Sequence, residues 1–330
     1  MKSKFLIFAI LLFGTGCAAD AADVLRPIDI KEWPISYGGR TRDPFAASAS
    51  QIWFVGQSGD YLARLDAASG KLMRHDLPDA PGPHNLVVGA DGIVWYSGNQ
   101  TGYIGRFDPK TGLTEKIPMP GGHVEDPHTL TFDRSEKHIW FTAQWSNVAG
   151  RLNVASRKVD LIAVPSGNAR PYGIIVAANG TPWIALLGTD KLASIDPRTL
   201  KLTEHAIAPG ARPRRLDAGN QGRIYYSDYR RGYLGRFDPK TGKTDEWKLP
   251  GGRGARPYAL VVGGAMVWLV ETGPSPNRFV GFDPAKDAVT SITPIPSGAG
   301  SVRHMHYHKG SGAIWFGTDE NTIGRALVGK

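Results

Sequence analysis

The sequence predicts an all-β protein with the architecture of a seven-bladed β-propeller, and three observations support this. One pattern of turn and strand residues recurs seven times along the 330 residues, with a period of roughly 40–45 residues that is typical of propeller blades. Glycine (41 residues) and proline (24 residues) are abundant, as in chains built from many short elements joined by turns. An N-terminal segment resembles the fourth strand of a repeat, and the last repeat lacks its fourth strand, which provides for closure of the ring.

The innermost strand of each predicted blade follows a turn, usually centred on proline, and consists of an apolar run. This combination marks the start of every repeat. The seven copies are RDPFAA (42–47), GPHNLVV (82–88), DPHTLTF (126–132), RPYGIIV (170–176), RPRRLDA (212–218), RPYALVV (256–262) and VRHMHYH (302–308).

Three further strands complete each unit. The third strand leads into a tight turn marked by Asp-Pro and Thr-Gly, as in YIGRFDPKTG (103–112) and YLGRFDPKTG (233–242). A fourth strand ends the unit, as in TDEWKLP (244–250). The second strand opens with an aromatic residue, and these residues are Trp53, Trp95, Trp140, Trp183, Tyr225, Trp268 and Trp315. Four short strands per repeat are what a propeller blade requires.

The chain ends predict how the ring closes. The seventh unit stops at TIGRALVGK (322–330), after its third strand. DIKEWPI (29–35) lies outside any unit and resembles TDEWKLP. We expect this N-terminal segment to supply the outer strand of the last blade, which leaves no open seam in the ring. Residues 23–330 are therefore expected to form one propeller domain.

Residues 1–22 have the layout of a secretory signal peptide. Two lysines precede an apolar run from Phe5 to Phe13 and a stretch of small residues, and the run is too short to span a membrane. The alternative is a lipoprotein signal, in which a lipid on Cys17 would be the protein's only attachment to a membrane. Both predict an exported protein, periplasmic or secreted. Since Cys17 is the only cysteine, an internal disulfide and a thiolate metal cluster are excluded.

The segment SVRHMHYHKGSGAIWFGTDEN (301–321) carries three histidines at alternate positions, His304, His306 and His308. Alternate residues of a strand share a face, so this pattern could chelate a metal. Alignment of the repeats instead predicts packing positions for His306 and His308, because the other blades have mostly apolar residues there. His304 falls in the turn position that should point to the central channel, and its predicted equivalents are Phe45, His84, His128, Tyr172, Arg214 and Tyr258.

Arginines gather around the same predicted channel mouth. Because guanidinium groups bind carboxylates and phosphates, they predict an anionic small-molecule ligand; the alternative is that each arginine holds a neighbouring turn by bonding its carbonyls. The formal net charge of +9 favours acidic partners or surfaces, but no basic run or nucleic-acid motif is present, so nucleic acid is not expected. The predicted substrate-binding residues are His84, His128, Tyr172, Arg214, Arg256, Tyr258 and Arg303.

Three phrases recur from blade to blade over residues 42–325: Pro-His/Tyr-x-Ile/Leu, Asp-Gly-x-x-Trp-Phe and Ile-Gly-Arg. In these phrases the chain resembles the virginiamycin B (streptogramin B) lyase family. The resemblance implies a seven-bladed propeller and an elimination reaction that opens a cyclic depsipeptide at its ester with the help of Mg²⁺. In such a reaction a base removes the proton next to the ester carbonyl, and the metal stabilises the enolate.

The resemblance also implies roles for individual residues. It makes His304 the catalytic base and Asp319 a metal ligand, whereas Val302 stands where the family has a metal-binding glutamate and Tyr258 stands where it has a substrate-contacting histidine. Mg²⁺ prefers several carboxylate or water oxygens. Glu271 from the neighbouring blade is therefore expected to complete a magnesium site, if one forms.

Two functions follow as alternatives. One is an exported lyase acting on an ester-containing small molecule or cyclic depsipeptide. The other is a propeller without catalytic activity that binds an anionic ligand or a protein partner at its central channel. Esterases and lactonases of the six-bladed calcium type fit less well, because the repeats number seven and acids are few at the mouth. Glu320, and the acid-Pro-His turn EDPH (125–128), offer other acids for a metal.

Overall fold

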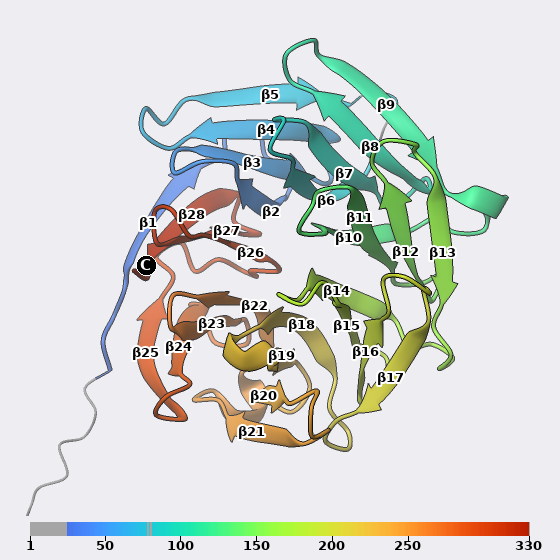
Figure 1. Cartoon of the computed structure of the whole chain (residues 1–330). Coiled ribbons are helices and arrows are strands. Elements are labelled where there is room, and N and C mark those ends of the chain that lie inside the picture. Colours follow the sequence, from blue (N-terminus) through green and yellow to red (C-terminus); the bar gives the residue numbers. More distant parts are fainter. Residues whose placement is uncertain (1–24, 78, 80, 330) are drawn as a thin grey trace, which may run out of the picture.

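The computed structural model describes residues 25–77, 79 and 81–329, so the predicted signal peptide and Cys17 lie outside the described residues. Its 28 strands form seven four-stranded antiparallel sheets around a central axis (Figure 1). The seven-bladed propeller is confirmed. Across the described ranges, no helix is long and apolar enough to cross a membrane. Three short 3-10 helices accompany the strands: η1 (Pro120–Gly122), η2 (Asn220–Gly222) and η3 (Gly252–Gly254).

Within blades 1 to 6 the strands run outward from the channel in chain order. Blade 1 comprises β2 (Thr41–Ala46), β3 (Gln51–Gly56), β4 (Tyr61–Asp66) and β5 (Leu72–Asp76); blade 2 comprises β6 (Pro83–Val88), β7 (Val94–Gly98), β8 (Tyr103–Asp108) and β9 (Leu113–Pro118). Blade 3 comprises β10 (Pro127–Phe132), β11 (His138–Ala143), β12 (Val148–Asn153) and β13 (Val159–Ala163); blade 4 comprises β14 (Pro171–Val176), β15 (Pro182–Leu186), β16 (Lys191–Ile195) and β17 (Leu202–Ala206). Blade 5 comprises β18 (Pro213–Ala218), β19 (Ile224–Asp228), β20 (Tyr233–Phe237) and β21 (Thr244–Lys248); blade 6 comprises β22 (Pro257–Gly263), β23 (Met266–Glu271), β24 (Arg278–Asp283) and β25 (Ala288–Pro294).

Blade 7 joins the two ends of the chain. It comprises β26 (Met305–His308), β27 (Ala313–Gly317), β28 (Thr322–Leu327) and, as its outer strand, β1 (Asp29–Pro34). β1 lies beside β28 in Figure 1 and pairs with it in antiparallel register along its whole length. Trp33 of β1 stacks on Trp315 of β27, with ring centroids 5.5 Å apart. The predicted closure by the N-terminal segment is confirmed.

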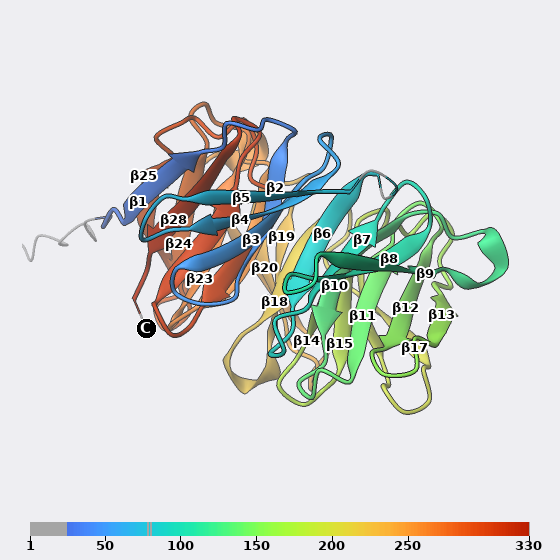
Figure 2. The same cartoon turned by 90° about the horizontal axis from the view of Figure 1, so that it is seen from above.

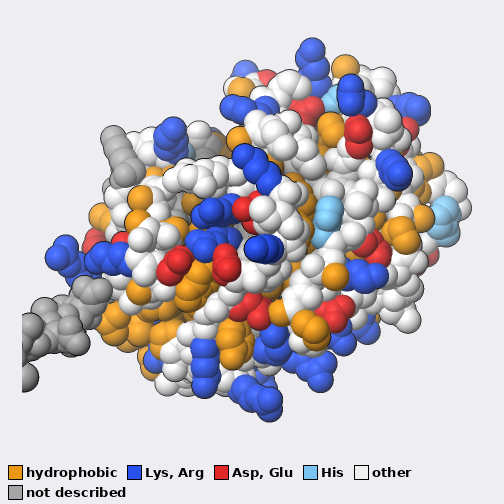
Figure 3. Space-filling model, turned by 60° about the horizontal axis from the view of Figure 1, so that its bottom comes forward, with side chains coloured by type: hydrophobic (Ala, Val, Ile, Leu, Met, Phe, Trp, Pro, Cys, Tyr) orange, Lys and Arg blue, Asp and Glu red, His pale blue; other side chains and the backbone are white. Residues whose placement is uncertain are grey.

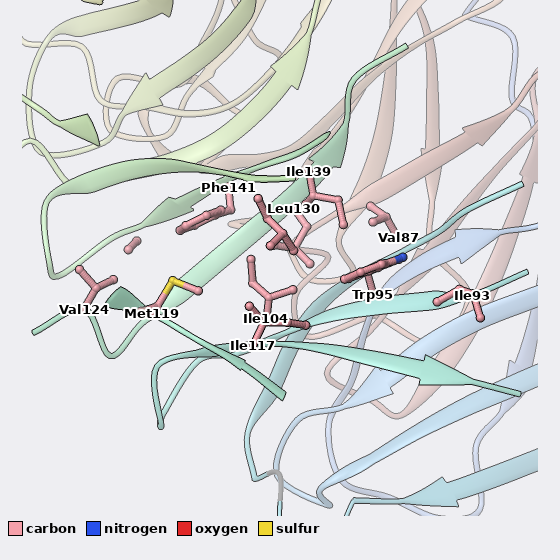
Figure 4. Packing of buried hydrophobic residues seen from close by; sticks show 12 residues of the cluster. Val87, Ile93, Trp95, Ile104, Ile117, Met119, Val124, Leu130, Ile139 and Phe141 are labelled. Atoms are coloured by element: carbon pink, nitrogen blue, oxygen red, sulfur yellow. The ribbon is translucent and has the colours of Figure 1, made fainter. Parts of the chain in front are cut away.

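Apolar side chains fill the spaces between neighbouring blades. The cluster between blades 2 and 3 shows the pattern, with Trp95 and Ile104 facing Leu130 and Phe141 (Figure 4). All seven aromatic residues that open the second strands are at most 5% exposed, and large rings contribute most of the buried apolar area. Figure 2 shows the twist of these blades around the ring.

A glycine on the third strand makes room for a ring on the second. Phe141 faces Gly150 across the β11–β12 pair, and a Cβ atom on Gly150 would lie 2.1 Å from the tip of the Phe141 ring. The ring therefore lies directly over the glycine backbone, which accounts for the glycine in the recurring Ile-Gly-Arg phrase. The same arrangement occurs at Gly105 with Tyr96, Gly235 with Tyr226 and Gly324 with Phe316.

Candidate functional site

The register of the innermost strands identifies equivalent residues in different blades, and it corrects the predicted alignment of blade 7. His306 pairs with Trp315, as Val87 pairs with Trp95 in blade 2. Alignment of the repeats on their turn residues sets His306 against Leu86 instead, which is one residue too early. The error arises because blade 7 has no proline in its turn to anchor the repeat.

The correction changes which residues line the channel mouth. Arg303, and not His304, is the blade 7 equivalent of His84, and in blade 1 the same argument puts Arg42 in place of Phe45. His304 lies one position further along. We call the first set the mouth ring: Arg42, His84, His128, Tyr172, Arg214, Tyr258 and Arg303. We call the second set the middle ring: Asp43, Asn85, Thr129, Gly173, Arg215, Ala259 and His304.

Five predicted substrate-binding residues meet in the mouth ring. The imidazole rings of His84 and His128 have centroids 3.9 Å apart, and the His128 ring lies 4.2 Å from that of Tyr172. The hydroxyl groups of Tyr172 and Tyr258 share a hydrogen bond. The Arg214 guanidinium lies 3.6 Å from the centroid of the Tyr258 ring, which is a close cation–π contact.

Of the other two predicted substrate-binding residues, Arg256 lies outside the mouth ring, and Arg303 belongs to the ring but contacts an acid of its own blade. Arg256 is exposed and lines a pocket beside the mouth ring. Arg303 forms an ion pair with Asp319, whose carboxylate is also 3.5 Å from Arg40. Arg303 is therefore paired with a neighbouring carboxylate, whereas Arg256 lines an open pocket.

The pocket beside the mouth ring is lined mainly by arginine. Its volume is about 900 Å³, and no Asp or Glu side chain lines it. On the face shown in Figure 3, Lys and Arg side chains outnumber Asp and Glu side chains. The lining residues are Arg170, Arg212, Arg214, Arg230, Arg253 and Arg256, with Gln144, Asn168, Leu187, Gly188 and Tyr229. We call this the arginine pocket.

Sequence reasoning missed Arg230 and Arg253 because both lie in loops outside the recurring turn motif. Arg230 follows β19 and Arg253 lies in η3. The signal that could have found them is basic loop composition, since YRRG (229–232) and GGRGAR (251–256) each contain two arginines.

The channel histidines are held neutral. Burial lowers the pKa of His84 and His128 well below the ordinary value, and the positive charges of Arg42 and Arg215 lower it further. Burial and Arg215 likewise bring the pKa of His304 to about 4. A general base works best when its pKa lies near the working pH, so His304 is placed as a weak base at pH 7.

The carboxylates predicted to hold Mg²⁺ are engaged elsewhere. Glu271 is fully buried; it forms an ion pair with Arg278 and accepts a hydrogen bond of 2.8 Å from the Gly251 N–H. Asp319 binds two arginines, as described above, and Val302 is buried in an apolar cluster. No group of three His, Cys, Asp or Glu residues that could hold a metal occurs in the part of the chain that the structure describes. This donor set does not fit Mg²⁺, which needs several free oxygen ligands.

A smaller cavity of about 250 Å³ lies at the inner strands, with Arg215, Asp217, His304 and His306 in its lining. Burial raises the pKa of Asp217 to about 6, although its carboxylate accepts hydrogen bonds from the N–H groups of Val262 (2.7 Å) and Ala218 (2.8 Å). The protonated carboxyl is therefore favoured in the folded protein relative to the unfolded chain.

This shift predicts a pH dependence of stability. Because the folded-state pKa of Asp217 lies above the ordinary value of 3.8, its contribution is fully present below about pH 4 and is lost as pH rises through about 6. The free energy of unfolding should fall by about 2 kcal/mol over this range through Asp217 alone. Urea unfolding at a series of pH values should show this component in the wild type and not in Asp217→Asn. The exposed Glu125→Gln variant should keep it; a pH profile unchanged by Asp217→Asn would contradict the prediction.

Comparison with solved structures agrees with the seven-bladed propeller fold. Virginiamycin B lyase from Staphylococcus aureus superposes with a TM-score of 0.81 at 21% identity, covering 91% of this chain and 99% of that chain. A catalytically inactive variant of that enzyme, solved with quinupristin, also gives 0.81, at 20% identity and the same coverage. The extracellular domain of a hybrid two component system from B. thetaiotaomicron gives 0.69 at 13% identity, covering 91% of this chain and 43% of that chain.

The comparison with curated proteins found no match. The structural likenesses, at these low identities, establish the fold. The evidence for kinship comes from a family model described as the virginiamycin B lyase family, which matches residues 28–195 and so covers just over half of the sequence. With the propeller described above, this match shows that the chain belongs to the virginiamycin B lyase family.

Proposed function

We propose that this protein is an exported propeller that binds an anionic small molecule in the arginine pocket. The observation that carries the proposal is the convergence of six arginines on one pocket of about 900 Å³ whose lining contains no carboxylate. Like charges brought together in this way repel one another, and a bound carboxylate or phosphate relieves the repulsion while accepting paired N–H bonds from the guanidinium groups. Export is supported by the extracellular propeller among the structural neighbours.

Part of the pocket is held rigid before any ligand arrives. Arg214 lies between the rings of Tyr258 and Tyr229, at 3.6 and 4.3 Å from their centroids. Arg212 donates a hydrogen bond of 2.8 Å to the Gly188 carbonyl. Fixing these guanidinium groups in advance reduces the entropy lost on binding. The exposed arginines of the pocket can then adjust to the ligand; they are Arg170, Arg230, Arg253 and Arg256.

Calorimetric titration tests the proposal with citrate and pyrophosphate as probes and triethyl citrate as the uncharged counterpart of citrate. At least one anion should bind with an affinity that weakens as salt is added, and the ester should not bind. Equal binding of ester and citrate, or binding of neither anion, would rule the proposal out. An acidic protein that bound where the small anions did not would move the site from small molecules to partner proteins.

A second candidate is the elimination reaction, with His304 as base on an ester-containing cyclic depsipeptide. Family membership favours it, as does the His304 Nδ1 atom, which is buried and has no hydrogen-bond partner among the described residues. The low pKa of His304 is evidence against it, and so are the ion pairs that already hold the Glu271 and Asp319 carboxylates. Incubation with a streptogramin B and Mg²⁺, followed by mass spectrometry, decides: elimination opens the ring without a change in mass, hydrolysis adds one water, and His304→Ala should abolish a true lyase activity.

A further inference from the structure

The two channel rings hold more positive charge than negative charge. Asp43 is the only acid in either ring, and it is 1% exposed. Arg42 Nε lies 3.2 Å from one Asp43 oxygen, and Arg215 Nη2 lies 3.6 Å from the other. Arg214 adds a third cation, which packs on tyrosine rings and has no carboxylate partner in the rings. The fourth arginine of the rings, Arg303, is paired with Asp319 outside them. The other three guanidinium groups share the single carboxylate of Asp43, and an uncompensated buried charge is strongly destabilising.

Five nitrogen atoms of the same rings are buried and have no hydrogen-bond partner among the described residues. Such atoms are rare in folded proteins, and each one costs free energy unless something binds it. Three of these atoms belong to residues that are at most 5% exposed, namely Arg42, His84 and Arg215. The atoms are Arg42 Nη2, His84 Nδ1, Arg214 Nε, Arg215 Nη2 and His304 Nδ1.

Arg215 brings these groups together because its side chain crosses the channel. From blade 5 it donates to the Thr129 hydroxyl in blade 3 (2.8 Å) and to the Arg303 carbonyl in blade 7 (2.9 Å). Its remaining nitrogen, Nη2, points to the side of blade 1, near Asp43. The guanidinium therefore lies across the channel at the level of the middle ring, and His304 follows Arg303 directly in the chain.

The chemistry of the unpartnered atoms specifies what can bind there. Guanidinium N–H groups donate hydrogen bonds and cannot accept them, and a neutral imidazole can donate from one of its nitrogens. A ligand among them must therefore accept several hydrogen bonds, and it should carry negative charge to offset the excess of cations. It must also be small, because Arg42, His84 and Arg215 are at most 5% exposed.

We infer that the channel core binds one small inorganic anion, of halide size, beside the Nη2 atoms of Arg42 and Arg215, with the His304 imidazole as a further donor. This site lies deeper than the arginine pocket and does not depend on the ligand proposed there. A single halide would supply acceptors for the orphaned donors and remove half of the excess positive charge. It would also help hold Arg215 across the channel.

Crystals grown in sodium bromide test the inference directly. An anomalous difference peak should appear in the channel, within contact distance of Arg215 Nη2 and Arg42 Nη2, and it should be lost in Arg215→Met. The same comparison can be made with Arg42→Gln if Arg215→Met does not fold. A channel that contains only water, or bromide bound only in the arginine pocket as an adventitious ion, would overturn the inference.

Thermal unfolding provides a second readout. At equal ionic strength, Tm in sodium bromide should exceed Tm in sodium gluconate, whose anion is too large for the core, by about 2–4 °C. Arg198→Met, on an exposed residue, should keep the difference, whereas Arg42→Gln should lose it. Equal Tm values in the two salts would count against the anion. Burial raises the pKa of Tyr172, but the positive charges of Arg214, Arg215 and Arg42 lower it by more. An ultraviolet spectrum showing that Tyr172 is ionised at neutral pH would therefore also count against the anion, because the phenolate would balance the excess charge.

Discussion

A triple variant in which glutamine replaces Arg230, Arg253 and Arg256 should bind citrate roughly 100-fold more weakly than the wild type. The reason is that each hydrogen bond to a charged group contributes more than a kilocalorie per mole. All three side chains are exposed and line the arginine pocket. Their loss removes half of the six positive charges without opening the hydrophobic interior. Calorimetric titration at low salt measures the effect, and the slope of affinity against salt concentration should become shallower.

The matched control removes three exposed basic side chains far from the pocket lining, in Lys110→Gln, Arg198→Gln and Lys240→Gln combined. It changes the net charge by the same amount, so any general electrostatic attraction falls equally in both triple variants. Citrate affinity should remain within about threefold of the wild type in this control. If both variants lost affinity equally, the ligand would be attracted by net charge and not by the pocket.

Gly150→Ala should lower the free energy of unfolding by about 3 kcal/mol, the upper end of the cost of overpacking a core. The new Cβ would lie 2.1 Å from the Phe141 ring, and Phe141 is fully buried. The ring cannot turn aside without displacing the cluster between blades 2 and 3. Urea unfolding followed by tryptophan fluorescence measures the loss.

Gly167→Ala is the control, because no atom lies within 4 Å of the Cβ it would add. Its stability should stay close to that of the wild type. The double variant Phe141→Leu/Gly150→Ala should recover part of the loss, since leucine has no ring to meet the methyl group. A Gly150→Ala protein as stable as the wild type would show that the ring shifts freely, contrary to the close packing described here.

The fold was predictable because the repeat leaves its mark on every strand. Blade number, strand order and the closing role of residues 29–35 all follow from local phrases that recur with a fixed period. The positions of the seven aromatic residues were predicted for the same reason, since each stands at the start of a second strand. Only the register of blades 1 and 7 was wrong, because Phe45 and His304 were aligned on turns that depart from the usual pattern.

The site was harder to predict because its contacts join residues from distant blades. No repeat relates Arg215 of blade 5 to Thr129 of blade 3, so nothing in the sequence shows that one side chain crosses the channel. Engagement of Glu271 by Arg278 is likewise a property of packing and not of spacing. The roles of His304 as base and Asp319 as metal ligand stay predictions from family resemblance. The low pKa of His304 and the ion pairs of Asp319 with Arg303 and Arg40 argue against them.

The joining of β1 to β28 has a consequence for how the molecule assembles. Six blades are made of residues close together in the chain, so each can begin to form as soon as its own strands exist. Blade 7 instead needs contacts between residues nearly a whole chain length apart, and such long-range contacts form slowly. The last blade cannot be completed until the final strand has emerged from the ribosome. We therefore expect an open, six-bladed intermediate whose exposed edges are its most aggregation-prone surfaces.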